Sequence, residues 1–402
     1  MVLRGHLAGS AYIVSVKTHS AAVMVDEPWV VAYDRGGRLY SVHRDLHTFR
    51  RGLSGHMLEK WQEGSVPHRR VVSPGCRDRL VDQSADLMRR VVAGLLTPQW
   101  SWDEPADPAA LEDGIAMLGR AARFDADAAR SDVQAFNAVY KPVGILPPDQ
   151  YLSLVVQATE GCSFNSCTFC DLYHDGYRVK TPDEFGRHVR SVREYLGASE
   201  LVRSRGLFLG AANALAVPMA RLRPLFDCLR DEFGETRAGV SVFVDGFTGA
   251  RKTAADYQEL KARGLRRVYI GLESGHDPLL AFVRKPGKAA DAIETAIAVK
   301  DAGLEVGVIV MIGLGGDRFA DPHTRDTAVA LNAIGLGEGD LLYFSDLVEV
   351  PGTIYPILAE QEKIGTLPAG QRRAQERAIR DLLRFQGTAP KMAVYDVREF
   401  VY

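Results

Sequence analysis

A regular alternation of strand and helix patterns between residues 151 and 347 restricts the possible folds more than any other feature of this sequence. Short runs rich in β-branched and aromatic residues are separated by stretches with the 3.6-residue spacing of amphipathic helices. Such alternation is typical of right-handed βαβ units around a parallel sheet. The predicted strands are residues 151–158, 206–210, 239–244, 267–272, 306–312 and 341–347. The predicted helices between them are residues 181–196, 218–233, 253–263, 288–302 and 321–334.

Six units of this kind predict an α/β fold, in the form of a partial, open (β/α)6 barrel. In such barrels the groups that carry chemistry stand at the C-terminal ends of the strands. We expect a helix at residues 371–385, and we expect the tail at 391–402 to close one end of the sheet. The predicted core is therefore residues 146–355, followed by a C-terminal helix and tail at 356–402.

Residues 1–145 have a different pattern and are predicted to form an N-terminal extension. Its first half is β-rich, and Asp34-Arg35-Gly36-Gly37 between two apolar runs predicts a hairpin. From Ser84 the spacing of apolar residues becomes helical, so Ser84 is the predicted cap of a helix. Asp107 and Pro108 predict the start of a second helix, because proline fits the first helical turn. We expect a mixed β/α extension.

Composition and charge narrow the class of protein. Hydrophobic residues make up 46% of the 402 residues and charged residues 25%, which is the balance of a globular protein. The 49 basic residues nearly equal the 51 acidic ones and form no basic tail, which argues against a nucleic-acid partner. No apolar run approaches the roughly 20 residues of a spanning helix, so no membrane partner is expected. Five cysteines, three of them clustered, are unlike a disulfide framework, and we expect a cytoplasmic location.

The clustered cysteines form the chemically most distinctive feature. Cys162, Cys167 and Cys170 have the spacing C-x4-C-x2-C and directly follow the first predicted strand. Three thiolates this close are typical of a metal or cluster site. With His174 as a fourth ligand they could hold a structural zinc ion, and without it a 4Fe–4S cluster with one open iron. The ample predicted core makes a structural zinc ion unnecessary, which favours the cluster.

Several longer segments, together with the cysteines, resemble the radical S-adenosylmethionine (SAM) superfamily. In order they are GCSFNSCTFCDLY, RRVYIGLESGHDPLLAFVRKPG, VGVIVMIGLGG, TAVALN and VPGTIY. They most resemble the branch that contains oxygen-independent coproporphyrinogen oxidases and related oxidoreductases. The resemblance covers residues 150–355, half of the chain. The commonest spacing in the superfamily is C-x3-C-x2-C, and the extra residue here lengthens the loop without removing a ligand.

The resemblance implies roles for the matching residues. The three cysteines would ligate three irons of a 4Fe–4S cluster, and the amino and carboxylate groups of SAM would bind the fourth iron. Phe169 matches an aromatic position that packs near the adenine of SAM. Gly210 and Asn213 belong to LGAAN, which matches a glycine-rich strand end near the methionyl amine. Because LGAAN lacks the usual second glycine and acid, we expect a backbone contact there.

Further positions would contact SAM if the resemblance holds. Glu273, at the end of the fourth predicted strand, matches a polar position that touches the ribose or carboxylate of SAM. Arg284 is a candidate partner for the SAM carboxylate, because a guanidinium group can donate two parallel hydrogen bonds to it. Asp245 is a further ribose candidate, and the glycines at 313–316 would let the backbone approach the adenine. The alternative for Glu273 and for Arg284 is an ordinary surface or helix-capping ion pair, and for 313–316 an ordinary turn at the end of a strand.

The resemblance finally implies an enzyme. An electron delivered to the cluster would cleave SAM into methionine and a 5′-deoxyadenosyl radical, which would abstract hydrogen from a small-molecule substrate. It also implies an external electron donor such as flavodoxin or ferredoxin. Two alternatives stay open at this point. One is the same chemistry on tRNA, and the other is a zinc-stabilised binding protein without catalysis.

Overall fold

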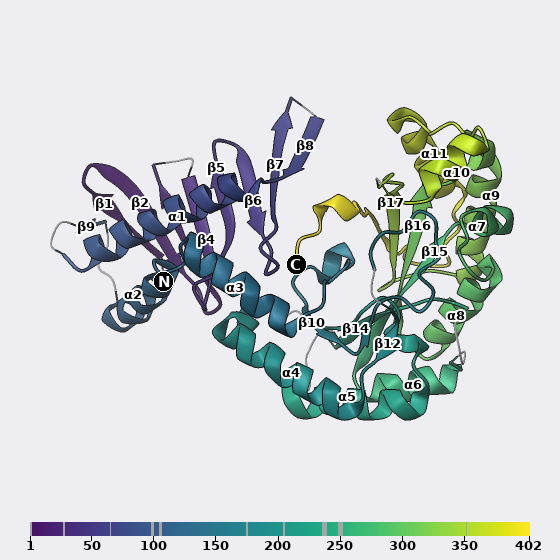
Figure 1. Cartoon of the computed structure of the whole chain (residues 1–402), viewed down its shortest axis with the longest axis horizontal. Coiled ribbons are helices and arrows are strands. Elements are labelled where there is room, and N and C mark those ends of the chain that lie inside the picture. Colours follow the sequence, from purple (N-terminus) through teal and green to yellow (C-terminus); the bar gives the residue numbers. More distant parts are fainter. Residues whose placement is uncertain are drawn as a thin grey trace. The chain divides into compact units, whose positions relative to one another are not determined.

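The chain folds into two compact units (Figure 1). The N-terminal unit consists of Met1–Pro142, Ser191–Ser204 and Val401–Tyr402, and the α/β unit consists of Val143–Arg190 and Arg205–Phe400. The computed structural model describes residues 2–26, 29–64, 66–97, 100–103, 107–173, 176–203, 206–234, 239–247, 252–350 and 352–402.

The described part of the α/β unit is built on a seven-stranded parallel sheet with the order β10-β13-β14-β15-β16-β17-β18. Its strands are β10 (Leu154–Gln157), β13 (Leu207–Gly210), β14 (Val240–Val244), β15 (Leu265–Glu273), β16 (Glu305–Ile312), β17 (Leu341–Asp346) and β18 (Lys391–Val394). All six predicted strands are present. The seventh, β18, comes from the C-terminal tail and pairs with β17, so the tail does complete one edge of the sheet.

Helices lie along the outer side of this sheet (Figure 1). They are α4 (Pro182–Leu196), α5 (Met219–Phe233), α6 (Ala254–Ala262), α7 (Asp277–Phe282), α8 (Ala289–Asp301), α9 (Gly316–Ile334), α10 (Tyr355–Gln361) and α11 (Ala369–Leu382). Among the described strands β10 and β18 are the two edges, so the sheet is open and forms no closed barrel. The predicted α/β class and the partial barrel are confirmed, with one strand more than the six expected.

The inner face of the sheet carries a layer of aromatic rings. The ring of Phe243 on β14 lies 5.1 Å from that of Phe208 on β13 and 5.9 Å from that of Tyr269 on β15. Gly307 on β16 lies in register with Tyr269 and leaves room for its ring. A Cβ atom at position 307 would stand 2.3 Å from Cδ1 of Tyr269. The layer therefore depends on a glycine in the middle of a buried strand.

A carboxylate lies at one end of this aromatic layer, near the N-terminal ends of the strands. Asp149 belongs to a short 3₁₀ turn just before β10. It accepts hydrogen bonds from the hydroxyls of Tyr269 (2.5 Å) and Tyr343 (2.7 Å) and from the guanidinium of Arg267 (2.9 Å). Three donors on one carboxylate compensate for removing it from water.

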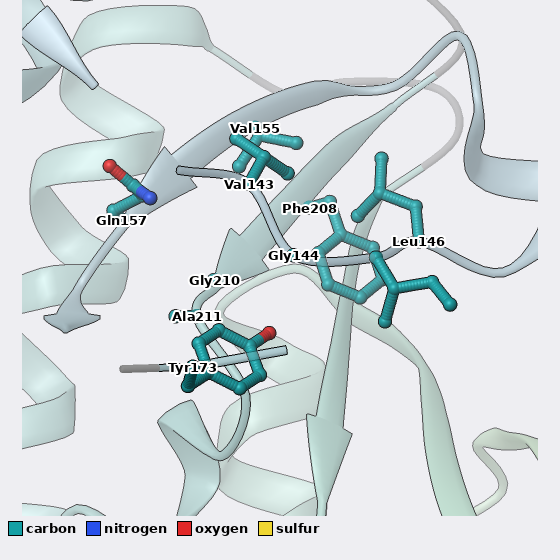
Figure 2. Close-up of a pocket in the computed structure, with 10 residues that line it drawn as sticks. Val143, Gly144, Leu146, Val155, Gln157, Tyr173, Phe208, Gly210 and Ala211 are labelled. Carbon is teal, nitrogen blue, oxygen red and sulfur yellow. The ribbon is translucent and has the colours of Figure 1, made fainter. Parts of the chain in front are cut away.

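The segment before this turn contacts both edges of the sheet. The carbonyl of Leu146 accepts a hydrogen bond from the hydroxyl of Tyr395, which follows β18 (2.8 Å). Val143 and Gly144 lie beside Val155 of β10, at the opposite edge (Figure 2). Residues 143–150 thus cover the inner face between the two edges.

The N-terminal unit contains an antiparallel sheet, which has nine strands in the part of the chain that the structure describes. The strand order is β8-β7-β6-β5-β4-β3-β2-β1-β9. The strands are β1 (Val2–Leu7), β2 (Ser10–Val16), β3 (Ser20–Val25), β4 (Trp29–Asp34), β5 (Leu39–Arg44), β6 (His47–Arg51), β7 (Met57–Glu63), β8 (Val66–Val71) and β9 (Ser101–Trp102). Helices α1 (Pro74–Leu95), α2 (Pro108–Ala121) and α3 (Ala126–Val139) share one hydrophobic core with it.

Most predicted element starts in the two units are confirmed. The hairpin at 34–37 joins β4 to β5, and α2 begins at Pro108. The prediction that a helix begins at Ser84 is wrong. Helix α1 begins at Pro74, since proline fits a first turn, and the buried Ser84 hydroxyl donates to the carbonyl of Leu80 one turn back (2.7 Å).

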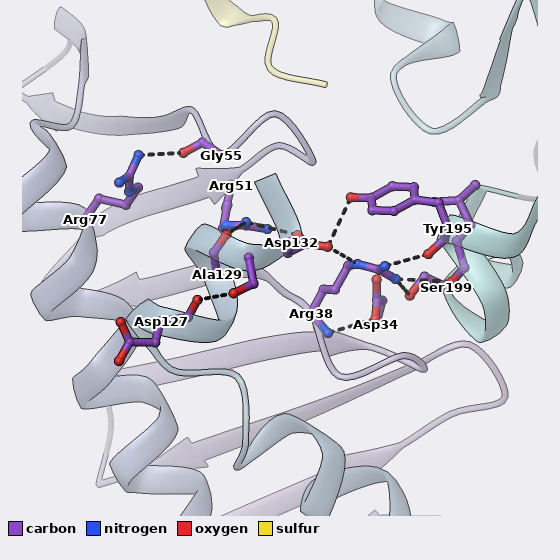
Figure 3. Close-up of polar contacts among 12 residues, drawn as sticks. Asp34, Arg38, Arg51, Gly55, Arg77, Asp127, Ala129, Asp132, Tyr195 and Ser199 are labelled. Carbon is purple, nitrogen blue, oxygen red and sulfur yellow. Dashed lines mark hydrogen bonds and ion pairs between the residues drawn. The ribbon is translucent and has the colours of Figure 1, made fainter. Parts of the chain in front are cut away.

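Buried charges tie residues 191–204 into the N-terminal unit (Figure 3). Asp132 on α3 accepts hydrogen bonds from Arg38 (2.7 Å), Arg51 (3.1 Å) and the hydroxyl of Tyr195 (3.1 Å). Arg38 also donates to the carbonyl of Tyr195 (2.6 Å) and the hydroxyl of Ser199 (2.7 Å). This network gives the end of α4 a structural role within that unit. No helix in the described residues is long and apolar enough to cross a membrane.

Candidate functional site

The cysteine loop starts at the C-terminal end of β10, where the sequence places it. Two short strands, β11 (Thr159–Glu160) and β12 (Arg178–Val179), pair at the base of the loop. Glu160 forms ion pairs with Arg178 (2.9 Å) and Lys180 (2.9 Å). The hydrogen bond from Arg178, with help from Lys180, lowers the pKa of Glu160 to about 2. These two cations therefore hold the base of the loop.

The three cysteine side chains carry free thiols that are only partly buried. Burial raises the pKa of Cys167 to about 11, and the nearby Cys162 and Cys170 add to this rise. Among the residues that the structure describes, no three His, Cys, Asp or Glu side chains are arranged to share one metal ion. His174, the fourth ligand of the zinc hypothesis, lies outside the described residues.

The middle of the loop is fixed to two helices. The backbone N–H and the hydroxyl of Thr168 both donate to the carbonyl of Val283 at the end of α7 (3.0 and 3.2 Å). The carbonyl of Thr168 accepts a hydrogen bond from the N–H of Tyr355 on α10 (2.9 Å). Phe169 packs against the apolar cluster around Leu314 and Tyr355. Phe169 is thereby placed beside the glycine turn that the sequence predicts to approach adenine.

The structure brings two predicted SAM contacts together beside the first cysteine. Asn213 accepts a hydrogen bond from the backbone N–H of Asp245 (3.1 Å) and donates to the carboxylate of that residue. Asn213 also donates to the hydroxyl of Ser163 (2.9 Å), which follows Cys162 directly in the chain. The ends of β13 and β14 are therefore joined to the cysteine loop by side-chain hydrogen bonds.

Glu273 and a lysine that the sequence analysis did not single out form an ion pair next to the loop. Lys285 Nζ lies 3.3 Å from Glu273 Oε1, and only 13% and 12% of the two side chains are exposed. Burial alone would lower the pKa of Lys285, but the charges of Glu273 and Cys167 outweigh it and raise that pKa. A protonated lysine thus stands beside the thiols.

Arg284, the predicted partner of the SAM carboxylate, is exposed, and its carbonyl accepts a hydrogen bond from Ser166 (3.4 Å). The sequence signal was an adjacent basic pair at the end of α7. Which member of such a pair faces inward depends on the backbone path, and here Arg284 has a φ of +54°.

The glycine turn after β16 adopts a conformation that only glycine tolerates easily. Gly313, Gly315 and Gly316 have φ values of +83°, +78° and +55°. All three of their N–H groups are bonded within the protein: Gly313 donates to Gln375 (2.8 Å), Gly315 to the hydroxyl of Tyr355 (2.9 Å) and Gly316 to the carbonyl of Gly313 (3.1 Å). The turn is therefore rigid, and its remaining surface is backbone.

A buried histidine, also missed from the sequence, fixes the backbone after Glu273. His323 on α9 pairs through Nδ1 with the hydroxyls of Ser274 (2.7 Å) and Thr327 (3.1 Å). Its Nε2 pairs with the carbonyl of Met311 (3.0 Å). Burial lowers the pKa of His323 to about 4, so the ring is neutral and its Nε2–H donates to that carbonyl. The ends of β15 and β16 are locked together in this way.

Comparison with known proteins decides the chemistry of this site. Residues 156–328, which contain the whole cysteine loop and the Glu273–Lys285 pair, match the family model described as the Radical SAM superfamily. This segment is a radical SAM domain. Radical SAM domains bind a 4Fe–4S cluster and SAM, and they are enzyme domains that use SAM for radical chemistry. The donor set fits such a cluster, since all three thiols are free and stand together at the strand ends.

Solved radical SAM enzymes resemble the chain at low sequence identity. Coproporphyrinogen III oxidase from Escherichia coli is 17% identical, with a TM-score of 0.42 over 62% of this chain and 55% of that one. The methyltransferase TsrM from Kitasatospora setae is 17% identical, with a TM-score of 0.40 over 52% and 39%. HydG, a maturase of [FeFe]-hydrogenase, is 15% identical, with a TM-score of 0.38 over 77% and 61%. The chain thus spans about half of the coproporphyrinogen oxidase. No curated protein sequence matches it.

Proposed function

We propose that this enzyme abstracts a hydrogen atom from a small-molecule substrate that is bound on the inner face of the sheet. The observation that carries the proposal is the gathering, at the C-terminal strand ends, of three free thiols, one largely buried cation and a hydrogen-bonded Asn–Asp pair. When bound, the reduced cluster and SAM supply the 5′-deoxyadenosyl radical for this step. Cys162, Cys167 and Cys170 would each hold one iron.

Lys285 is the cation that we assign to the carboxylate of SAM, in place of the neighbouring Arg284. It is largely buried, it stands next to Cys167, and it is held in place by Glu273. A carboxylate that arrives at this point would meet a fixed, protonated ammonium group, which is the geometry of a strong charge-assisted hydrogen bond. Arg284 lies on the surface, where an ion pair contributes little.

The remaining contacts are assigned to polar side chains and backbone around the cysteine loop. Glu273 uses one carboxylate oxygen for Lys285, and the other has no partner among the described residues, so it can accept from a ribose hydroxyl. Asn213 and Asp245 form a second polar group, which Asn213 joins to the cysteine loop through the hydroxyl of Ser163. Gly210 offers backbone without a side chain, and Phe169 offers an aromatic face near the glycine turn.

An external one-electron donor such as flavodoxin or ferredoxin is part of this proposal, because the described residues contain no further cysteine cluster to hold a second centre. The small-molecule substrate is favoured over tRNA by the formal net charge of −2, which gives little attraction for a polyanion.

The central experiment is anaerobic reconstitution with iron and sulfide, followed by assay with dithionite and SAM. The wild-type protein should gain the visible absorbance of a 4Fe–4S cluster and form 5′-deoxyadenosine. Cys162→Ala, Cys167→Ala and Cys170→Ala should each lose both signals, whereas the matched controls Cys76→Ala and Cys228→Ala should keep them. A fully loaded cluster that never cleaves SAM would contradict the proposal.

Adjacent basic residues allow a second, sharper test. Lys285→Met should weaken SAM binding by about tenfold, the equivalent of 1.4 kcal/mol, while the cluster absorbance is retained. Arg284→Met should change SAM binding less than twofold. If the two variants behaved in the opposite way, the carboxylate would be bound by Arg284 instead.

A further inference from the structure

The tip of the cysteine loop, residues 164–166, has no role in the proposed function. It contains the additional residue that makes the spacing between Cys162 and Cys167 longer than is commonest in the superfamily. All three of its residues are exposed. The hydroxyl of Ser166 donates to the carbonyl of Arg284 (3.4 Å), which connects the tip to the end of α7. The tip is therefore an exposed surface feature that ends directly before one of the three thiols.

An aromatic pair supports the tip. Phe164 is 45% exposed, yet its ring packs edge-on against that of Phe247, with the centroids 5.4 Å apart and the ring planes at 90°. Phe247 in turn lies against Gly287, where a Cβ atom would stand 2.6 Å from the Cβ of Phe247. The ammonium group of Lys285 lies 5.8 Å from the centroid of the Phe247 ring. The exposed ring is thus held in place, so a partner that contacts it loses little side-chain entropy.

Two exposed cations lie beside this aromatic pair. Arg284 is joined to the tip through its carbonyl, and Lys288 follows the glycine that packs against Phe247. Among the described residues neither side chain has an ion-pair partner, whereas the neighbouring Lys285 is paired with Glu273. We call residues 164–166, Phe247, Arg284 and Lys288 the tip surface. It presents an apolar ring and two unneutralised positive charges.

The backbone on both sides of the contact between the tip and α7 is strained. Asn165 has a φ of +48° and Arg284 a φ of +54°, in the left-handed region that is unfavourable for residues other than glycine. Such conformations persist where the surrounding structure fixes them, and they are concentrated at functional sites. The tip surface is therefore a built feature of the chain and not a loosely extended loop.

The chemistry of the tip surface specifies a partner. Exposed cations attract an acidic protein, and aromatic and arginine side chains are enriched in protein interfaces. Two cations without a longer basic stripe are too few to bind a nucleic acid. Electron transfer slows steeply with distance, so a protein that reduces the cluster has to dock close to the thiols, as this surface allows. Flavin carriers expose the apolar edge of their ring, which is complementary to an exposed phenyl ring.

We infer that the tip surface is the docking site of the electron donor, and that this donor is an acidic flavoprotein carrier. The flavin edge would contact Phe164, and carboxylates of the carrier would lie near Arg284 and Lys288. One electron passes from the reduced flavin to the oxidised cluster, so the flavin is oxidised by one electron and the cluster is reduced by one. The inference rests on the proposed function, because it names the partner of the same site.

The first test measures binding and needs no turnover. The reconstituted protein is titrated with flavodoxin, an acidic flavoprotein carrier, in a calorimeter at low and at high salt. Arg284→Glu and Lys288→Glu should each weaken binding by about tenfold at low salt. These losses should shrink at high salt, because ions screen exposed charges. The matched control Arg377→Glu makes the same charge change at an exposed position on α11 and should bind like the wild type.

The apolar contact has a different signature. Phe164→Ala should weaken flavodoxin binding by about fivefold at both salt concentrations, because an apolar contact is not screened.

The second test compares two reductants of the loaded enzyme. Dithionite needs no docking site, so Arg284→Glu and Lys288→Glu should form 5′-deoxyadenosine with dithionite as fast as the wild type. That result also shows that both variants fold and hold the cluster. With a limiting concentration of reduced flavodoxin, each variant should be slower by about tenfold.

Flavodoxin binding that both charge reversals leave unchanged would overturn the inference. So would equal losses of rate with flavodoxin and with dithionite, or a wild type that is reduced by a ferredoxin and not by flavodoxin.

The outcome is separable from that of the proposed function. A wild type that binds flavodoxin through Arg284 and Lys288 but never forms 5′-deoxyadenosine would refute the proposed function alone. A wild type that cleaves SAM with dithionite, but whose flavodoxin binding ignores both cations, would refute the docking site alone.

Discussion

Replacing Gly307 with alanine tests how tightly the aromatic layer on the inner face is packed. The new Cβ would stand 2.3 Å from Cδ1 and 2.6 Å from Cε1 of Tyr269, well inside contact distance. Tyr269 is fully buried, and its hydroxyl is held by Asp149. The ring therefore cannot move away from β16 without weakening that hydrogen bond.

Two opposing effects determine the size and the sign of the change. In a strand interior, glycine to alanine ordinarily stabilises a protein by about 0.5–1 kcal/mol, because glycine loses more backbone entropy on folding. Overpacking of a close-packed core costs about 1–3 kcal/mol, and displacement of the hydroxyl from a charged acceptor adds about 1.5–3 kcal/mol. We therefore expect Gly307→Ala to lower the free energy of unfolding by about 1.5–5.5 kcal/mol.

Urea unfolding followed by circular dichroism measures the loss, and hydrogen exchange of peptides from β15 and β16 assigns it to the α/β unit. Gly186→Ala on α4 is the matched control, since its nearest atom would lie at 3.6 Å, and it should stabilise the protein. The double variant Gly307→Ala/Tyr269→Leu should lose less than the sum of the single variants. A Gly307→Ala protein as stable as the wild type would refute the packing argument.

Three further predictions concern buried or paired charges. Burial lowers the pKa of His323 to about 4 from 6.5. Between these two pH values His323 is protonated only in the unfolded chain, so the free energy of unfolding decreases by about 1.4 kcal/mol for each unit by which the pH falls. His323→Gln should lose this slope in urea titrations made at each pH, and an unchanged slope would contradict the assignment. The pKa of Glu160 is lowered to about 2 from 4.5. The stability that its ion pairs contribute is therefore fully present above pH 4.5 and is lost as the pH falls through 2. At pH 7, Glu160→Gln should raise hydrogen exchange in the cysteine loop several-fold, whereas the exposed Glu194→Gln should leave it unchanged. Asp132→Asn should destabilise the N-terminal unit by about 3–5 kcal/mol, because it leaves the buried Arg51 without its anion. Tryptophan fluorescence checks this prediction, since all four tryptophans belong to that unit, and an unshifted midpoint would refute it.

The parts of the fold that the sequence predicted are those set by local rules. Helix α4 lies within the predicted range and begins with a capping box, in which Thr181 and Glu184 exchange hydrogen bonds of 3.2 and 2.8 Å. The parallel strands were recognisable because each is short, apolar and followed by a helical pattern. The position of the cysteine loop then followed from the rule that loops after parallel strands gather at one edge of the sheet.

The parts that could not be predicted depend on contacts between distant residues. Strand β18 has only four residues, whose side chains are exposed or half-exposed, and it forms because it can pair with the edge of β17. The proposed choice of Lys285 over Arg284 rests on burial, which differs between the two neighbours at a single left-handed residue after α7. The role of His323 depends on Ser274, 49 positions earlier in the chain, and no local pattern connects the two.

The two ends of the sheet differ in whether their polar groups have partners within the protein, and this difference indicates where ligands bind. At the start of the strands, Asp149 receives three donors, and the hydroxyls of the aromatic layer are satisfied within the protein. At the other end, Glu273 has a φ of +58° at a register shift in β15, a conformation that costs a non-glycine residue energy. Next to it, one oxygen of Glu273 has no protein partner among the described residues. A strained residue with an open carboxylate oxygen beside three free thiols is best explained by ligands that complete the site.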